Sequence, residues 1–531
     1  MLTVVVIFTG AETQDPTAIS VDRFIDPNGS NFVTNPNPPF VVQPNQCTNA
    51  ALPCATLDWA VDQADPGDTI IASCGDYVAE ETAELNKNLT IRSDNRCAVF
   101  SAPGKRVINI SNSAAVTLIS LQVSGGDAGS GNGGGIRVRS GSSLILEDVL
   151  VKNNEAESGG GILAGGALTI KDSEVLENDA ANMGGGIRVG SNGSLTMINS
   201  EVRLNLAGGQ GGGIHSSGQT IISENSAVSF NNSLGSGAGI AADDGTLAIS
   251  DSIVNTNFTA ITPGPGGFIN GGGGLHISGA DVLIERSFIV VNKADRGGGI
   301  DVSSGELRIE SSTISENVAA RAGGGLANFA ETTAHNSTFS GNKAGVDDEP
   351  GEGGAFYNWG SSSMLILASV TTAFNEAGSG GGLYNTSFAV VGLANVIFAQ
   401  HLFSKDCVNT QNGLFVIRSD YLSEDGTCPG ALVLPAGLEP LADNGGPTET
   451  HMPGKLSEAV DIGDPAICAE LGNVDQRMVS RVNMDGNGDP ADGNPCDMGA
   501  VERDASPLPP VPFSIYIPLV SSDLRSNTTS Q

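Results

Sequence analysis

The sequence has few basic residues, few aromatic residues and no long hydrophobic run. Lysine and arginine number 25 against 59 aspartate and glutamate residues, a formal net charge of −34, which repels nucleic acid and anionic membrane surfaces. No stretch approaches the roughly 18 apolar residues that a bilayer-spanning helix needs. Aromatic residues make up 5% of the chain, fewer than an ordinary globular core uses. We therefore expect no nucleic-acid partner and no transmembrane span.

Glycine is abundant, and its clusters recur along the middle of the chain. The 72 glycines include ten short clusters, each followed by an apolar residue. The steps between these apolar residues are 26, 25, 27, 26, 35, 25, 26, 30 and 27, a period that marks an array of stacked units. The ten apolar residues are Ile136, Ile162, Ile187, Ile214, Ile240, Leu275, Ile300, Leu326, Phe356 and Leu383.

Each unit reads as three short strands joined by turns. In residues 184–205, Ile187 and Val189 alternate with polar residues, Leu195 and Met197 do so after a Gly/Ser/Asn turn, and a third run ends at Asn205. Such a unit cannot bury its apolar side chains alone, but coils stacked in register form one continuous core. The sequence therefore predicts an all-β fold, a right-handed parallel β-helix, which we expect to be a monomer.

An asparagine closes each unit at a constant place. Asparagine tolerates the left-handed backbone region, and its amide both donates and accepts hydrogen bonds. We expect the stacked side chains to form an internal ladder, and the alternative is a row that binds or transforms a ligand. The nine residues are Asn154, Asn178, Asn205, Asn231, Asn257, Asn292, Asn317, Asn342 and Asn375.

Eight cysteines lie in two groups, four before the glycine repeats and four after them. An even number without any closely spaced metal-binding pair favours disulfides formed in an oxidising compartment. Neighbour pairing is our hypothesis among the 105 connectivities that eight cysteines allow. It joins Cys47 with Cys54, Cys74 with Cys97, Cys407 with Cys428, and Cys468 with Cys496.

The chain divides into five parts by composition. The apolar start and a Pro/Asn-rich stretch are interpreted as a partial signal peptide and an irregular lead-in, and a short amphipathic helix near residues 57–64 is typical of a cap. The predicted parts are 1–46, the lead-in; 47–100, the N-terminal cap and first coil; 101–389, the β-helix repeats; 390–503, a C-terminal cysteine-containing cap; and 504–531, a Pro-rich tail. We expect an extracellular or cell-surface location.

The repeats resemble those of bacterial polymorphic outer-membrane proteins. Their signatures, Phe-x-x-Asn and Gly-Gly-Ala-Ile, correspond here to an apolar-x-x-Asn element followed by Gly-Gly-Gly/Ala-Ile/Leu over residues 130–385. Phe339 to Asn342 is the copy most like the signature, since most units have Val, Ile or Leu in place of Phe. The C-terminal β-barrel of an autotransporter is not found in this sequence, which argues against self-translocation.

Residues 390–503 contain the motifs "NVIFAQ", "DCVN", "LEPLADNGGPTETHMP", "AVDIGDPAIC", "DQR" and "CDMGAVE". Together these motifs resemble the choice-of-anchor Q domain, which ends many secreted bacterial β-helix proteins. Departures are Glu458 and Val482, where proline is usual, and Met478, where glycine is usual. The resemblance implies surface anchoring, and the tail that follows resembles short sorting elements of secreted proteins.

One segment places oxygen ligands at alternate positions, as calcium loops do. It contains Asp485, Asn487, Asp489 and Asp492, although the position where a calcium loop has a bidentate glutamate is Cys496. A plain Asn/Asp turn explains the same residues. Calcium is thus the one cofactor considered, and no other is expected.

No catalytic residues can be named from the sequence. Polysaccharide lyases and glycoside hydrolases need paired carboxylates or a base with cations, whereas Lys152, Arg188, Arg203, Arg286 and Arg296 show no repeated clustering. We predict a structural, adhesive or glycan-binding protein whose partner is an extracellular glycan or cell surface, and an enzyme of those two classes is the alternative. Loops 258–271 and 344–353, with Tyr357 and Trp359, are the expected contact region.

Overall fold

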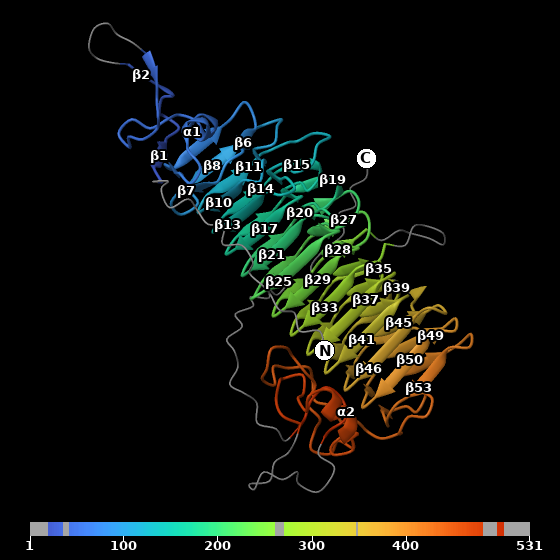
Figure 1. Ribbon diagram of the computed structural model, residues 1–531. Coiled ribbons are helices and arrows are strands. Elements are labelled where there is room, and N and C mark those ends of the chain that lie inside the picture. Colours follow the sequence, from blue (N-terminus) through green and yellow to red (C-terminus); the bar gives the residue numbers. More distant parts are fainter. Residues whose placement is uncertain (1–19, 35–41, 261–269, 347–348, 482–495, 504–531) are drawn as a thin grey trace, which may run out of the picture.

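A computed structural model describes residues 20–34, 42–260, 270–346, 349–481 and 496–503, which coil into a parallel β-helix (Figure 1). Four sheets run along its axis, with 15, 14, 13 and 10 strands among the described residues. The 15-stranded sheet runs from β1 (Asp22–Ile25) to β53 (Leu414–Ile417), and the 14-stranded sheet runs from β5 (Gly75–Val78) to β54 (Leu422–Ser423). The 13-stranded sheet runs from β6 (Ala83–Leu85) to β52 (Cys407–Asn409), and the 10-stranded sheet runs from β15 (Glu155–Ser158) to β44 (Glu349–Pro350). Successive coils pair in parallel, which confirms the predicted fold class.

One coil shows how the sequence pattern becomes structure. Its strands are β20 (Ile187–Val189), β21 (Ser194–Ile198), β22 (Glu201–Arg203) and β23 (Leu206–Ala207). The alternating apolar residues of the first three strands point inward and are fully buried. The fourth strand is a difference from the three that we predicted, because two residues after the asparagine also pair with the neighbouring coils.

The glycine cluster is required by two different constraints. Gly184 has a backbone φ of +67°, a conformation that costs glycine little and other residues more. A Cβ atom on Gly186 would lie 2.9 Å from Nδ2 of Asn205 and 2.8 Å from the carbonyl oxygen of Gly213. The third glycine thus leaves the space that the asparagine side chain fills, so the two repeated features depend on each other.

The nine predicted asparagines lie in one buried row. Nδ2 of each of the first eight donates to Oδ1 of the next asparagine at 2.9–3.0 Å, and that Oδ1 also accepts from the backbone N–H of the preceding one. The backbone N–H of Gly126 occupies the first position. At the other end His401 takes the place of a tenth asparagine and accepts from the N–H of Asn375.

The N-terminal end is covered by a helix, as expected. α1 (Leu57–Gln63) buries Leu57, Ala60 and Val61 and contacts the first strand of the 13-stranded sheet. The lead-in is less irregular than we predicted, because β1 pairs with β4 (Thr69–Ala72) and starts the 15-stranded sheet. The disulfides here join Cys47 with Cys54 and Cys74 with Cys97.

At the C-terminal end the coils continue past residue 389, where we expected the repeats to end. β50 (Val390–Ala394) pairs with the coils on either side, because its inward residues Val391 and Leu393 keep the apolar alternation although no glycine cluster follows. Cys407 pairs with Cys428, and Cys468, in α2 (Pro465–Glu470), pairs with Cys496.

The last part of the chain lies along the side of the β-helix rather than only across its end. Gln476 donates to Oγ1 of Thr313 at 2.9 Å and accepts from Oγ1 of Thr338 at 2.6 Å, and both threonines point outward from the 14-stranded sheet. His451 Nε2 lies 2.8 Å from Oγ of Ser340 on the same sheet. This C-terminal region therefore docks on several coils of one face.

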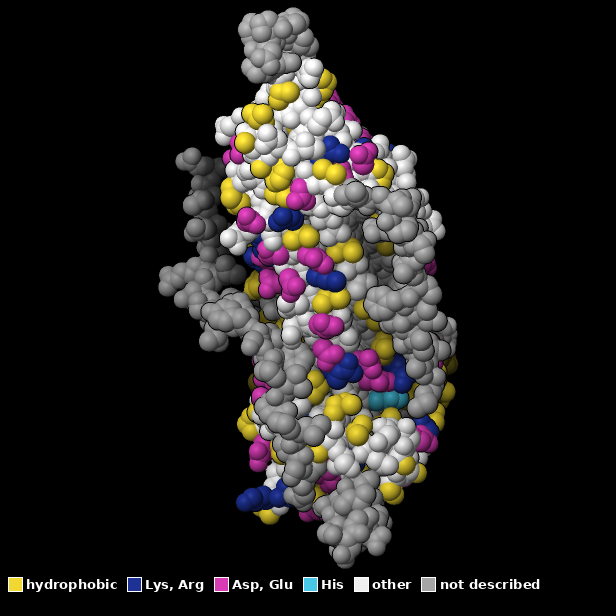
Figure 2. Space-filling view, turned by 60° about the vertical axis from the view of Figure 1, so that its left-hand side comes forward, with side chains coloured by type: hydrophobic (Ala, Val, Ile, Leu, Met, Phe, Trp, Pro, Cys, Tyr) yellow, Lys and Arg dark blue, Asp and Glu magenta, His cyan; other side chains and the backbone are white. Residues whose placement is uncertain are grey.

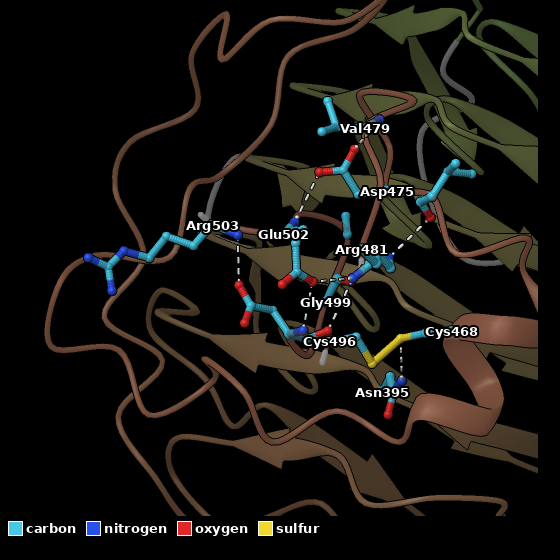
Figure 3. A network of polar contacts seen from close by, with 12 residues as sticks. Asn395, Cys468, Asp475, Val479, Arg481, Cys496, Gly499, Glu502 and Arg503 are labelled. Atoms are coloured by element: carbon cyan, nitrogen blue, oxygen red, sulfur yellow. Dashed lines mark hydrogen bonds and ion pairs between the residues drawn. A yellow bond between two sulfur atoms is a disulfide. The ribbon is translucent and has the colours of Figure 1, made fainter. Parts of the chain in front are cut away.

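A buried polar network holds the C-terminal region together (Figure 3). The fully buried Arg481 donates to Oδ1 of Asn336 at 3.1 Å and to the carbonyl oxygen of Gly499 at 2.8 Å. Asp475 pairs with Arg477 at 2.7 Å and accepts from the N–H of Glu502 at 3.0 Å. Residues of the "DQR" and "CDMGAVE" motifs thus form the inside of this region and its contact with the coils.

The outer surface mixes charges of both signs with apolar side chains. On the side shown in Figure 2, acidic and basic side chains lie interspersed along the long axis between hydrophobic ones. Neither helix of the described residues has the length and hydrophobicity that crossing a bilayer requires.

Candidate functional site

The outward face of the 13-stranded sheet carries an unusual row of side chains. In each of these short strands the first and third residues point into the core, and the second residue points away from it. Strand register aligns these middle residues on consecutive coils. The outer row, as we call it, consists of His215, Ala241, His276, Asp301, Ala327, Tyr357 and Tyr384.

Four aromatic residues gather at the C-terminal end of this row. Tyr357 on β45 (Phe356–Trp359) stacks on Tyr384 of β49 (Leu383–Thr386), with ring centroids 5.8 Å apart and planes at 18°. Phe329 lies 6.0 Å from Tyr357 and 5.5 Å from Trp359. Trp359 is 45% exposed, and the other three are half-buried. We call these four residues the aromatic strip.

The phenol of Tyr357 stays protonated at any physiological pH. Burial and the nearby carboxylate of Glu352 raise the pKa of Tyr357 to about 12. The strip therefore offers neutral rings with hydroxyl groups at one edge, a combination that can pack on an apolar surface and hydrogen-bond at its rim.

Asp301, on β36 (Ile300–Val302), lies beside the strip and is completely buried. Arg296 donates to both of its oxygens at 2.6 and 3.1 Å, and Nδ1 of His276 lies 2.9 Å from Oδ2. Burial alone would raise the pKa of Asp301, but the His276 hydrogen bond and the Arg296 charge outweigh it and lower the pKa to about 2.

The Arg296 guanidinium also lies 4.0 Å from the ring centroid of Phe329. This cluster fixes one end of the strip. Since both Asp301 oxygens are engaged and shielded from solvent, the arrangement as it stands positions the strip and presents no free carboxylate.

A second histidine–aspartate pair lies further along the row. Nε2 of His215 is 3.0 Å from Oδ2 of Asp243, and His215 is 2% exposed. Nδ1 of His215 and Oδ1 of Asp243 have no hydrogen-bond partner among the described residues. The pair is thus only partly satisfied.

Beneath the strip runs a second asparagine ladder that we did not predict. Asn328, Asn358 and Asn385 each donate from Nδ2 to Oδ1 of the next member, ending at Asn409, at 2.9–3.1 Å. They are inward neighbours of Ala327, Tyr357 and Tyr384 in the strands. The sequence signal was present, because an asparagine stands two residues after the apolar residue that follows the glycines in three successive coils.

The predicted calcium ligands Asp485, Asn487, Asp489 and Asp492 lie outside the described residues, so this site stays a prediction. Elsewhere Asp461, Asp497 and Glu502 bring carboxylate oxygens within 4.8 Å of one another. Burial and the Asp497 charge raise the pKa of Glu502 to about 8, and Arg481 lies 3.9 Å from it. The positive charge of Arg481 makes these carboxylates a structural group and disfavours a cation.

Of the two expected loops, residues 261–269 of the first lie outside the described residues. In the second, β44 pairs antiparallel with β43 (Lys343–Val346), next to a shallow pocket of about 300 Å³. Tyr357 and Trp359 belong to a strand of the β-helix rather than to a loop, and register brings Phe329 and Tyr384 to them.

Comparison with solved structures gives alignments that cover most of the chain at low sequence identity. A crystal structure of a pectate lyase aligns at a TM-score of 0.32 and 14% identity, covering 92% of this chain and 97% of that chain. A rhamnogalacturonan lyase aligns at a TM-score of 0.25 and 15% identity, covering 80% and 92%. No family model and no curated protein matches the sequence.

Proposed function

We propose that this is a secreted or cell-surface β-helix protein that binds an extracellular glycan through the aromatic strip. One observation carries the proposal: four aromatic side chains from three consecutive coils meet on one face. The C–H face of a sugar ring is apolar and packs on aromatic rings, while its hydroxyl groups bind polar neighbours. Coils follow one another at about 4.8 Å, so the strip extends along the axis and suits a linear chain of sugars.

A structural or adhesive role suits this site better than catalysis. Glycoside hydrolysis needs two carboxyl groups facing the substrate, whereas Asp301 is buried and fully hydrogen-bonded. The rigid support of the strip, two asparagine ladders and the Arg296 cluster, favours binding by a preformed surface.

We propose further that residues 390–503 act as a choice-of-anchor Q region that keeps the protein at the cell surface. Its motif residues are built into the fold: Gln476 binds the 14-stranded sheet, and Asn395 donates to the Asp464 carbonyl oxygen at 3.1 Å. Four disulfides support an oxidising location.

The test measures binding of the full chain to a panel of immobilised neutral and acidic polysaccharides, with the double variant Tyr357→Ala/Trp359→Ala. We expect affinity for the bound polysaccharide to fall about tenfold or more, since each ring contact contributes of order 1 kcal/mol. Phe403→Ala is the control, because Phe403 is 88% exposed and lies by the pocket of β43 and β44.

Two results would overturn the proposal. Equal binding by the wild type and the double variant would remove the strip from the site. Release of unsaturated or reducing sugar products in a depolymerisation assay of the same polysaccharides would replace the non-catalytic role with that of a lyase or hydrolase.

A further inference from the structure

Four arginines lie on the same face as the aromatic strip, toward the other end of the β-helix. Arg137 on β12 (Ile136–Val138) and Arg188 on β20 are middle residues of their strands and lie two coils apart, separated by Leu163. Arg139 follows β12 directly, and Arg106 precedes β9 (Ile108–Ile110). Arg188 aligns with His215, so the outer row continues into this arginine group.

No member of the arginine group forms an ion pair with a described residue, unlike Arg203 and Arg286 on other faces. Arg203 and Arg286 approach carboxylates at 2.9 and 2.7 Å. Arg106 instead donates to the carbonyl oxygens of Gly133 and Asn132, each at 2.8 Å. These bonds hold its position without neutralising its charge.

The arginines also act on one another. Burial and the charge of Arg137 lower the pKa of Arg106, and burial and the charge of Arg139 lower that of Arg137. The nearby carboxylate of Glu84 opposes both pKa shifts without pairing with either arginine, and it accepts a 2.6 Å hydrogen bond from Asn109. In a chain with 59 acidic residues, leaving adjacent cations unpaired is unfavourable unless an anion from outside completes the site.

We propose that the arginine group is the anion-binding end of the glycan-binding face and that the ligand is an anionic polysaccharide. This inference rests on the proposed function. Guanidinium groups bind carboxylate and sulfate oxygens through paired N–H donors, so the charged group is a uronate carboxylate or a sulfate ester. Arg188 and Tyr357 lie six coils apart in the strand order, on the labelled strands β20 and β45 (Figure 1), about 30 Å at the usual coil spacing. A single linear polysaccharide can therefore contact both the arginine group and the aromatic strip.

The inference corrects our expectation that basic residues are scattered without clustering. Lys152, Arg203, Arg286 and Arg296 do lie apart from the group, but Arg188 joins three arginines that the sequence did not single out. The signal was Arg137 and Arg139, two residues apart and so on one face of a strand.

The experiment compares the double variant Arg137→Gln/Arg139→Gln with the matched control Arg92→Gln/Lys152→Gln. The control removes two positive charges from β7 (Leu89–Arg92) and β14 (Leu150–Lys152), in other sheets, and neither residue forms an ion pair with a described residue. Binding of the full chain is measured to polygalacturonate, dextran sulfate and neutral dextran over a range of NaCl concentrations. The two anionic polymers distinguish carboxylate from sulfate.

We expect the arginine variant to bind the preferred anionic polymer at least about tenfold more weakly, with a smaller salt dependence, and the control variant to bind as the wild type does. Unchanged binding by the arginine variant, or equal loss in the control, would overturn the anion site. If Tyr357→Ala/Trp359→Ala still weakens binding in that case, the proposed function stands without this inference. If neither variant affects any polysaccharide, both fail.

Discussion

At the scale of single residues, the most unusual acid in the C-terminal coils is Asp406. It is 3% exposed and accepts hydrogen bonds from Ser423 Oγ at 2.8 Å and from the N–H of Asp425 at 3.3 Å. Burial and the Asp425 charge raise its pKa from 3.8 to about 7. The folded protein therefore holds a proton on Asp406 that the unfolded chain releases near pH 4.

This raised pKa predicts that Asp406 makes folding less favourable as pH rises. Its contribution is fully present below pH 3.8 and is lost as pH rises to about 7, because the folded state binds more protons than the unfolded state throughout that window. We expect Asp406→Asn to remove this dependence, so that the variant gains up to about 4 kcal/mol relative to the wild type between pH 4 and pH 7.5. Melting temperatures of both proteins at several pH values measure the change.

Asp172→Asn is the control, since Asp172 is exposed. It should shift the melting curves equally at all these pH values. A constant difference between the wild type and Asp406→Asn would show that Asp406 is ionised in the folded state.

Some residues of the site could be singled out from the sequence and others could not. Tyr357 and Trp359 were singled out as aromatic residues of the expected contact region, next to loop 344–353. Phe329 lies nearly 30 residues before Tyr357, and Tyr384 lies nearly 30 residues after it. The repeat that separates Phe329 from Tyr357 is 30 residues long. Only strand register shows that these side chains are neighbours, and register depends on how each insertion is accommodated between coils.

At the scale of elements, the asparagine ladder is the feature that the sequence defined most clearly. Its period follows the glycine clusters, and a polar residue at a fixed internal position must be hydrogen-bonded. The fourth strand was missed because two-residue strands have too few residues to show an alternating pattern. The docking of residues 430–481 and 496–503 on the 14-stranded sheet was missed because the sheet offers only ordinary serines and threonines to it, such as Thr313, Thr338 and Ser340.

The ladder predicts a large cost for removing one member. Asn231→Ala removes the acceptor of both the backbone N–H and one Nδ2 hydrogen of Asn205. The buried backbone N–H then has no acceptor, and Nδ2 keeps only its bond to the carbonyl oxygen of Val175. We expect the free energy of unfolding to fall by about 3 kcal/mol, measured by urea denaturation followed by far-ultraviolet circular dichroism.

Asn232→Ala serves as the matched control, because Asn232 is the next residue and its side chain is exposed. It should cost about 0.5 kcal/mol or less. Similar values for the two variants would mean that the ladder contributes little beyond what the sheets provide.

At the scale of the whole molecule, the excess of acidic residues opposes folding. A formal charge of −34 is spread over a rod, so that like charges repel one another along its length. Many exposed ion pairs, such as Lys171 with Glu147 at 3.7 Å, contribute little to stability. Screening of these charges by salt should therefore stabilise the folded state, because it weakens the repulsion more than it weakens the ion pairs.

We expect the melting temperature to rise by a few degrees when NaCl is increased from about 10 mM to about 150 mM, since the Debye length shortens from about 30 to about 8 Å. Scanning calorimetry measures the shift. Sucrose at equal osmolality controls for general exclusion effects. A lower melting temperature at the higher salt concentration would show that attractive ion pairs dominate.

The asparagine ladder has one direction, since every bond between two of its side chains runs from Nδ2 of one coil to Oδ1 of the next coil toward the C-terminal end. The bond between Asn257 and Asn292 is 3.0 Å long although 35 residues separate them, the same length as across the ordinary repeats. Extra residues are thus accommodated in the loops between coils, whereas an insertion that displaced the ladder by part of a coil would break it. Gene duplication can lengthen such a rod only by whole coils in one orientation, while its loops are free to diverge.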